Sequence, residues 1–556
     1  MIDAINADMP FDRFAVEQIA GDLIEESGDR IQESSNTPEL APASRLLTPE
    51  RRSRLIATGF NRNTTVNVEA GTDPEEDRVK QVVDRVNTTA TVFLGLTIEC
   101  AQCHDHKYDP ITQAEYFGLF AYFNNTPIES KRYGSATLQF ESPELELPID
   151  QPRQVERRLA VDHRKRLREI IEQAKSAGAE AVEIKRLQDD LARTERRIKE
   201  LTPTTLVMQE LPEPRETYLM KRGDFLSPGE RIVPGVPRAL HALPTDAAPN
   251  RLGVARWLAS AENPLIARVT VNRWWAEFFG NGIVTTLEDF GSQGEPPTHP
   301  ELLDWLAVEF IESGWSMKQI HRLIVTSSTY RQSSAGTSPV DPENKLLWRG
   351  PRLRLPAEMI RDHALAAAGL LSRKMHGPPV RPPQPPDVWR VTGFVDNTYR
   401  PSDGEDRYRR GIYAIRRRSG PYPSFSNFDA PDRAACTVQR PRSNTPLQAL
   451  TLMNDEVYVE AAGALARQML AGSDSDSASD VVEYAFARVL SRAPTAAERS
   501  HLEAVYDTER RHYAAHLSAA EALAARVGAG VAPEEAAAWF IVATILLNLD
   551  EAITKN

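Results

Sequence analysis

The sequence predicts a mainly α-helical protein of several domains, with minor β structure and a helical hairpin between its globular parts. Apolar residues recur at helical spacing through most of the chain. A highly charged segment after residue 150 carries a heptad pattern. The 556 residues also exceed what one ordinary hydrophobic core accommodates. We therefore predict three parts, covering residues 1–150, 151–202 and 203–556.

The first part is expected to be helical on both sides of a short cysteine motif. Polar turns are expected around residues 37–43, and valines at helical spacing predict a helix over residues 76–96. Thr112 is an N-cap signal for an aromatic-rich helix over residues 113–123. Its aromatic side chains either wall a cofactor or pack as ordinary core, and their helical spacing favours core. They are Tyr116, Phe117, Phe120, Tyr122 and Phe123.

Residues 151–202 are predicted to form two antiparallel helices that turn near Gly178, as in a coiled-coil arm. The second helix carries apolar residues on a heptad seam, with Thr194 in the one missing position: Ile184, Leu187, Leu191, Ile198 and Leu201. The first helix carries an apolar stripe of Leu159, Leu167, Ile170 and Ala174. Such an arm is a spacer or a docking element, and its pattern implies no catalysis.

The third part begins with proline-rich, extended sequence and continues as helices. Residues 216–223 predict a short strand and a turn. Helical patterns then cover residues 251–259, 265–279, 300–313, 317–327 and 357–371. Residues 378–386 predict a proline-rich loop, residues 409–417 predict a strand, and the last 110 residues of the chain predict Ala-rich helices.

Composition and the chain ends narrow the class of protein. A net charge of −12 argues against a general nucleic-acid binder, because phosphate binding needs a basic surface. No segment reaches the roughly 20 apolar residues of a membrane span. The N-terminus has Asp3, Asp8 and Asp12 where a signal peptide has basic and apolar residues, and an amphipathic pattern begins at once. We expect a truncated start, with an export signal upstream.

The most specific chemical signal is Cys100-Ala-Gln-Cys103-His104, which uses two of the three cysteines in the chain. This is the spacing by which a c-type haem is attached: the two thiols add to the haem vinyl groups, and the histidine is an axial ligand of the iron. The next methionine in the sequence is Met208. We therefore expect an iron whose sixth position is open or filled from a distant segment, with His106 and His299 as weak candidates.

Other interpretations of the motif remain open. A Cys-x-x-Cys pair is also found in redox sites, in zinc sites and as buried thiols. Cys100, Cys103, His104 and His106 are four potential ligands of zinc or another divalent metal, and Asp109 is a further local candidate.

The wider sequence resembles a known pair of domains. Residues 99–111, ECAQCHDHKYDPI, resemble the signature of the second planctomycete cytochrome-like domain, DUF1549. Residues 263–274, 289–291, 299–306 and 443–450 resemble its partner, the planctomycete-specific C-terminal domain DUF1553. The resemblance assigns the first part to DUF1549 and the third part to DUF1553. It implies a bacterial, extracytoplasmic, haem-associated protein, in some genomes encoded near genes for breakdown of sulfated polysaccharides, and it supplies no established reaction.

A second group of polar residues lies in the third part. Arg273, Asp289, His299 and Asp304 fall close together in sequence among glycines and are weak catalytic candidates. Asn272 and Glu301 belong to the same stretch, and a further set follows: Arg361, Asp362, His363, Asp429, Asp432, Arg433, Cys436, Arg440, Arg442, Asn444 and Gln448. A pocket with carboxylate, His and Arg suits an anionic substrate. The alternative is structural: Asn272 and Arg273 satisfy buried backbone groups, residues 298–301 cap a helix, Thr445 and Pro446 begin another, and Cys436 is a buried thiol.

These observations favour an extracytoplasmic c-type-haem protein that transfers electrons or performs haem-linked redox chemistry, with a redox partner protein or an additional cytochrome domain. The alternatives are a non-haem metal protein associated with breakdown of an anionic polysaccharide, and a non-enzymatic scaffold that docks through the helical arm. Whether the protein is an enzyme stays open.

Overall fold

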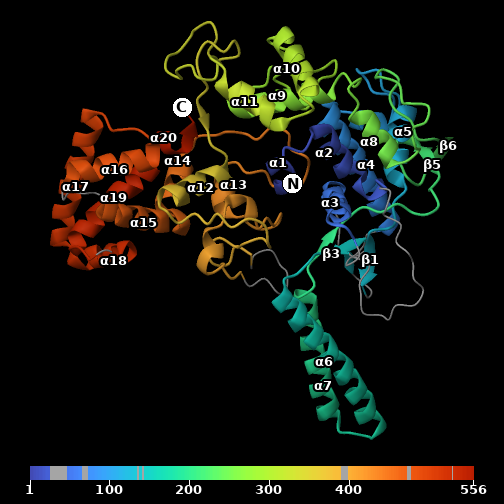
Figure 1. The fold of residues 1–556 in the computed structure, drawn as a ribbon, viewed down its shortest axis with the longest axis horizontal. Helices are drawn as coiled ribbons and strands as arrows, with labels where there is room; N and C mark the ends of the chain where they lie inside the picture. The colour runs from blue at the N-terminus through green and yellow to red at the C-terminus, as the bar shows by residue number, and fades with distance from the viewer. Residues whose placement is uncertain are drawn as a thin grey trace. The chain divides into compact units, whose positions relative to one another are not determined.

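The computed structural model describes residues 1–25, 47–65, 73–133, 137–140, 143–389, 399–472, 477–528 and 530–555, with the backbone alone at 130–133 and 137–140. The prediction of a mainly α fold with minor β structure is confirmed (Figure 1). The turns predicted at residues 37–43 lie outside the described residues. No helix in the described ranges is both long and apolar enough to cross a membrane.

The chain forms two compact units. The first comprises Met1–Trp274 and Ile283–Leu323, and the second comprises Trp275–Gly282 and Ile324–Asn556. This division differs from the three predicted parts, because much of the predicted third part folds with the first unit. The predicted domain boundaries at residues 150 and 202 therefore remain predictions.

The first unit is built mainly from helices. Its α-helices are α1 (Ile2–Asn6), α2 (Phe11–Ala20), α3 (Pro49–Ala57), α4 (Pro74–Thr89), α5 (Gln113–Asn124), α6 (Gln151–Ser176), α7 (Ala181–Glu200), α8 (Arg251–Leu258) and α10 (Pro300–Glu312). Two further helices, α9 (Ile266–Phe279) and α11 (Met317–Thr326), begin in this unit and end in the second. Short 3-10 helices are η1 (Gly21–Leu23), η3 (Thr58–Arg62), η5 (Glu99–Gln102) and η6 (Lys221–Gly223), and a π-helical turn, η4, covers Ala90–Leu94.

Three two-stranded antiparallel sheets accompany these helices. They pair β1 (Ser130–Tyr133) with β2 (Thr137–Phe140), β3 (Glu144–Glu146) with β4 (Thr204–Leu206), and β5 (Thr217–Met220) with β6 (Pro228–Ile232). The strand and turn predicted at residues 216–223 are therefore confirmed. The β5–β6 hairpin matters for function because its turn reaches the cysteine motif.

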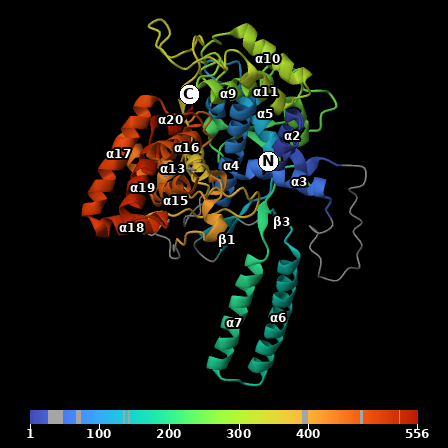
Figure 2. The same cartoon turned by 60° about the vertical axis from the view of Figure 1, so that its left-hand side comes forward.

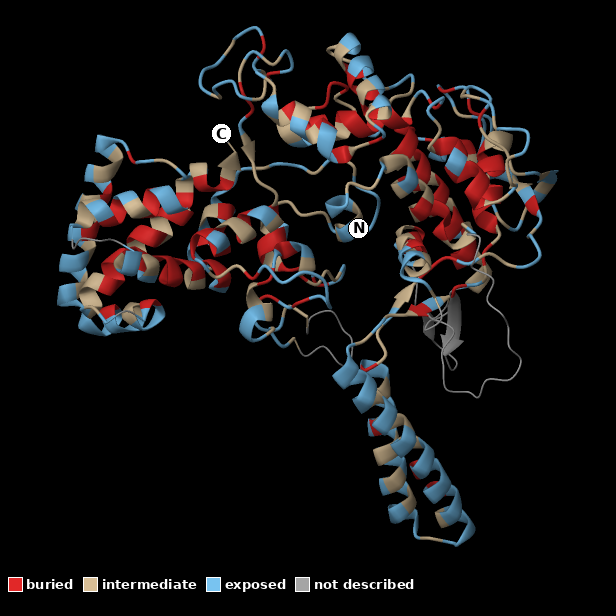
Figure 3. Cartoon of the chain, in the orientation of Figure 1, coloured by how far each residue is buried: buried red, intermediate tan, exposed pale blue. Residues whose placement is uncertain are grey.

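The two helices that flank the cysteine motif begin at side-chain caps, of which the one at Thr112 was predicted. At the start of α4, the side chain of Asp73 accepts hydrogen bonds from the N–H groups of Glu75 and Glu76. Thr112 and Glu115 form a capping box at the start of α5. The five aromatic residues of α5 are at most 1% exposed, so their interpretation as core is confirmed (Figure 3).

The predicted helical hairpin is confirmed as α6 and α7, which run antiparallel side by side (Figures 1 and 2). Gly178 lies in the turn between them with φ +72°, a conformation that glycine adopts without strain. Thr194 is buried at its seam position. The stripe predicted on the first helix is wrong at Leu159 and Ile170, which are 61% and 45% exposed, because the buried face of α6 runs through Leu167 and Ile171.

The second unit confirms the helical prediction for the end of the chain. Its helices are α12 (Ala357–Ala367), α13 (Pro423–Asn427), α14 (Pro446–Asn454), α15 (Glu456–Gly472), α16 (Ala478–Leu490), α17 (Ala496–Ala515), α18 (Leu517–Val527), α19 (Pro533–Leu547) and α20 (Asp550–Ile553). The short strand β7 (Leu353–Arg354) pairs with β8 (Thr554–Lys555). Two 3-10 helices, η8 (Gly404–Tyr408) and η9 (Gly411–Tyr413), belong to the same unit. One apolar core of many alanines joins α12, α15, α16 and α19.

The strand predicted at residues 409–417 is wrong. The segment contains η9 and makes only isolated bridges, Ser372 with Arg409 and Val380 with Ala414, within the described residues. Arg409 is 0% exposed and donates to backbone carbonyl oxygens, including that of Pro378 at 3.1 Å. In this segment the buried Arg409 therefore bonds with loop carbonyls, and the backbone forms isolated bridges rather than a strand ladder.

Candidate functional site

The cysteine motif lies on an exposed turn of the first unit, just after α4 and its π-helical end. Gly95 ends that helix with φ +60°, and its carbonyl accepts a hydrogen bond of 2.7 Å from the N–H of Phe290. The 3-10 turn η5 follows, with Ala101 fully buried beneath it. Cys100 and Cys103 are both exposed, and neither forms a disulfide. The turn therefore anchors its middle in the core and presents both thiols outward.

His104 is exposed and oriented by its own backbone. Its Nδ1 lies 2.7 Å from the carbonyl oxygen of Asp105. A carbonyl oxygen only accepts, so this contact selects the tautomer with the proton on Nδ1. The lone pair is then on Nε2, which is the arrangement of an imidazole ready to bind a metal ion.

His106 does not offer its Nδ1 as a ligand, because that atom bonds within the loop that follows the motif. Its Nδ1 accepts a hydrogen bond of 2.8 Å from the N–H of Asp109 and lies 3.5 Å from the Asp109 carboxylate. Its side chain is only 5% exposed. The N–H of His106 also donates to the carbonyl of Ile111 at 2.8 Å. His106 thus closes the loop between the motif and α5.

The turn of the β5–β6 hairpin packs against the motif, which sequence reasoning missed. A Cβ atom added at Gly223, where φ is +75°, would lie 2.9 Å from the Sγ of Cys103. The side-chain amide of Gln113 donates to the carbonyl of Gln102 at 2.9 Å and to that of Met220 at 3.1 Å. A glycine in a turn gives no indication of which distant residue it approaches.

Tyr116 lies beneath the same turn. Its hydroxyl donates to the Oδ1 of Asn87 at 3.2 Å. Burial raises the pKa of Tyr116, and the negative charge of Glu99 raises it further. Tyr116 therefore stays protonated and acts as a fixed hydrogen-bond donor.

The residues of the motif fit a c-type haem. Two free, exposed thiols stand beside an imidazole with an available Nε2. Tyr108, four residues after His104, is 52% exposed. A four-ligand zinc site fits less well, because His106 is engaged with Asp109. Among the described residues, no group of three or more His, Cys, Asp or Glu side chains is arranged to hold a metal ion.

Of the methionines after the motif, Met208 is 1% exposed in the core of the first unit, and its N–H donates to Thr58 at 2.8 Å. Met220 is half-buried and lies on the hairpin that contacts the motif. Of these two methionines, Met220 is therefore the one whose segment contacts the motif.

The four weak catalytic candidates have four different sets of partners. Arg273 donates to the carbonyls of Val92 and Thr91, each at 2.5 Å, and also to that of Leu287. The carboxylate of Asp289 accepts from the N–H of Gly291 at 2.8 Å. His299 lies 2.9 Å from the hydroxyl of Thr298, and Asp304 pairs with Arg268 at 2.7 Å on the surface.

The structural interpretation of Asn272 and Arg273 is confirmed. Asn272 is 0% exposed and exchanges two hydrogen bonds of 2.9 Å with the backbone of Val284. The expected helix start at Thr445 is confirmed as a capping box with Gln448. At α10 the N-cap residue is His299, which makes no side-chain capping bond. Cys436 is exposed, so its interpretation as a buried thiol is wrong.

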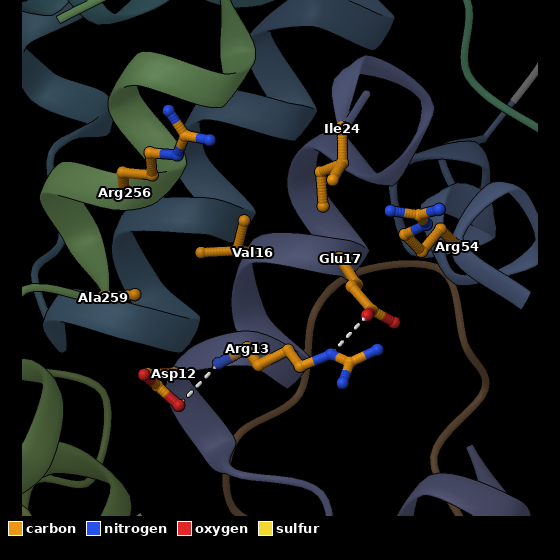
Figure 4. A pocket seen from close by; sticks show the side chains of 8 residues that line it. All are labelled: Asp12, Arg13, Val16, Glu17, Ile24, Arg54, Arg256 and Ala259. Carbon is orange, nitrogen blue, oxygen red and sulfur yellow. Dashed lines mark hydrogen bonds and ion pairs between the residues drawn. The ribbon is translucent and has the colours of Figure 1, made fainter. Parts of the chain in front are cut away.

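The first unit also contains a cavity of about 390 Å³ between α2, α3 and α8 (Figure 4). It is lined by Asp12, Arg13, Val16, Glu17, Ile24, Arg54, Arg256 and Ala259. Arg13 and Glu17 pair with each other across one turn of α2 at 2.8 Å. Because charges of both signs line this cavity, it does not define a ligand class.

Two family models match the chain. Residues 1–127 match PSCyt2, a protein of unknown function (DUF1549), and residues 250–506 match PSD1, a protein of unknown function (DUF1553). The chain therefore belongs to the proteins in which a DUF1549 domain is followed by a DUF1553 domain. No curated protein and no solved structure matches it.

Proposed function

We propose that this protein carries a c-type haem bound to Cys100, Cys103 and His104 and serves in electron transfer or haem-linked redox chemistry. The observation that supports this proposal is the orientation of His104. Its Nδ1 contacts the carbonyl of Asp105 at 2.7 Å, which leaves Nε2 as the free ligand atom, next to two exposed thiols. This is the ligand set that haem c requires.

The role of each residue follows from its position. Cys100 and Cys103 would hold the haem through two thioether bonds, and His104 would supply a nitrogen ligand to its iron. The bound haem supplies one-electron redox chemistry. The carbonyl of Asp105 holds the imidazole in one tautomer, and the His106–Asp109 pair holds the loop that carries His104. Hydrogen bonding to an axial histidine raises its basicity as a ligand.

Electron transfer needs a second redox centre, so the proposal includes a redox partner protein or an additional cytochrome domain. An exposed motif on an acidic chain suits contact with another protein rather than with nucleic acid. Because haem c is attached outside the cytoplasm, we also propose an extracytoplasmic location.

Two other functions are weaker proposals. A non-haem metal protein would need ligands beyond Cys100, Cys103 and His104, because His106 bonds with Asp109. A scaffold that docks through α6 and α7 has in its favour only the exposed polar surface of that hairpin.

The test is a pyridine haemochrome assay on protein made with an export signal and the haem maturation machinery. We expect haem that remains with the polypeptide in acidified organic solvent, because thioethers are carbon–sulfur bonds. The double variant Cys100→Ala/Cys103→Ala should lose it. Cys436→Ala is the matched control, since it removes the third exposed thiol.

Haem that extracts from the unmodified protein would contradict the covalent attachment. Stoichiometric zinc without a Soret band would favour the metal alternative. Binding of neither group by correctly folded protein would leave the scaffold proposal.

A further inference from the structure

Three arginines of the second unit converge on a single carboxylate, that of Glu358 near the start of α12. Arg416 pairs with its Oε1, and the Nη1 of Arg440 lies 2.9 Å from its Oε2. The Nη2 of Arg433 lies 4.0 Å from Oε1. Three guanidinium groups and one carboxylate leave this cluster with an excess of two positive charges.

The acidic residue next to Arg433 in the sequence is Asp432, whose hydrogen bond among the described residues is within its own turn and not with the arginines. Its carboxylate accepts this hydrogen bond of 2.9 Å from the N–H of Ala434. The repulsion within the cluster affects its arginines. Burial lowers the pKa of Arg433, and the charges of Arg416 and Arg440 lower it further.

The arginines are held in place and still reach solvent. The guanidinium carbon of Arg416 lies 5.1 Å from the centre of the Phe425 ring. Arg433 has φ +67°, and its carbonyl accepts a hydrogen bond of 2.7 Å from the Nε of Arg418. The side chains of Arg433 and Arg440 are 48% and 35% exposed, whereas that of Glu358 is 15% exposed. A ligand therefore meets the arginines before it meets the carboxylate.

We infer that Arg416, Arg433 and Arg440 form a binding site for a doubly charged tetrahedral oxyanion. The group is sulfate or phosphate, either free or as a monoester. Its two charges match the excess of the cluster, and guanidinium groups bind such oxygens in pairs of parallel hydrogen bonds. This site lies in the second unit and is independent of the haem proposal.

Isothermal titration calorimetry of the full chain with inorganic sulfate and inorganic phosphate tests the site, at an ionic strength fixed with chloride. Glucose 6-sulfate and glucose 6-phosphate are the ester arms of the experiment. We expect saturable binding that Arg433→Asn weakens about tenfold or more. Asparagine is the replacement of choice because it tolerates positive φ.

For Glu358→Gln we expect the opposite effect on the affinity for the dianions. Removal of the competing carboxylate should tighten binding of the dianions, about tenfold. Arg511→Gln is the control, because it removes an exposed arginine of α17 whose hydrogen bond among the described residues is local, to the carbonyl of Asp507. Thermal unfolding of each variant shows whether it is folded.

A purely structural ion cluster predicts another pattern. In that case Glu358→Gln lowers the unfolding temperature, and the folded wild-type protein gives no saturable heat with any of the four probes. That result, or binding that is equal in wild type and Arg433→Asn, would overturn the inference. Tighter binding of the two esters than of the free ions would identify a monoester as the ligand, and equal binding would identify the free ion.

Discussion

The carboxylate of Asp109 accepts a hydrogen bond of 2.7 Å from the backbone N–H of Ser292. Asp109 lies five residues after His104, and Ser292 lies in the glycine loop between α9 and α10. The same carboxylate faces Gly291, where an added Cβ would be 2.6 Å from Oδ2. Asp109 and Gly291, which are 182 positions apart in the sequence, therefore pack closely against each other within the first unit.

Gly291→Ala should lower the free energy of unfolding by about 1–3 kcal/mol, because the new methyl group meets the buried carboxylate that accepts from the N–H of Ser292. Asp109→Ala should cost about 1–3 kcal/mol by leaving the N–H of Ser292 without its acceptor. The double variant should cost less than the sum of the two, since the clash is then absent. Urea unfolding of the four proteins measures this coupling.

Gly530→Ala is the control for this cycle, because a Cβ atom there meets open space among the described residues. It should change the free energy of unfolding by less than about 0.5 kcal/mol. Additive costs of the two variants in the cycle would show that Gly291 is restricted for some reason other than Asp109.

The contact between Asp109 and Ser292 also illustrates which features could be predicted from the sequence and which could not. The N-caps at Thr112 and Thr445, the helices and the hairpin seam at Thr194 could be predicted, because neighbouring residues determine them. The approach of Gly223 to Cys103 could not, since it joins residues 120 positions apart.

The four catalytic candidates are close in sequence and have different partners in the structure. Arg273 donates to carbonyl oxygens of the π-helical turn η4, whereas Asp289 accepts from the N–H of Gly291 in its own loop. Polar residues that satisfy buried backbone have the same composition as an active site. In contrast, the two thiols and the imidazole of the cysteine motif lie within five residues, so the sequence alone could single them out as a candidate site.

Asp455, which precedes α15, should make stability depend on pH. Burial raises the pKa of this carboxyl to about 6 from 3.8, and Glu456 adds to the shift. The folded protein therefore holds the proton more tightly than the unfolded chain, so this contribution to stability is full below pH 3.8 and is lost as pH rises through about 6. Asp455→Asn keeps a cap for the N–H of Val457, now 3.0 Å from Oδ1.

We expect the stability of Asp455→Asn relative to wild type to increase between pH 4 and pH 7, by up to about 3 kcal/mol. Denaturant unfolding at several pH values across this range measures the difference. A difference that is the same at pH 4 and pH 7 would show that Asp455 titrates alike in the folded and unfolded states.

The last prediction concerns the sixth position of the iron in the haem-loaded protein. His104 is exposed. Met208 is buried in the core, and its backbone N–H donates a hydrogen bond to the hydroxyl of Thr58. We therefore expect the reduced protein to bind carbon monoxide with a shift of the Soret band, as an iron with an open position does. Met220 is the competing ligand, because its carbonyl is joined through Gln113 to Gln102 of the motif. If reduced protein fails to bind carbon monoxide and the oxidised protein shows the far-red band of a Met–iron bond, the open-iron hypothesis is wrong. Loss of that band in Met220→Leu, but not in the exposed control Met453→Leu, would then assign Met220 as the sixth ligand.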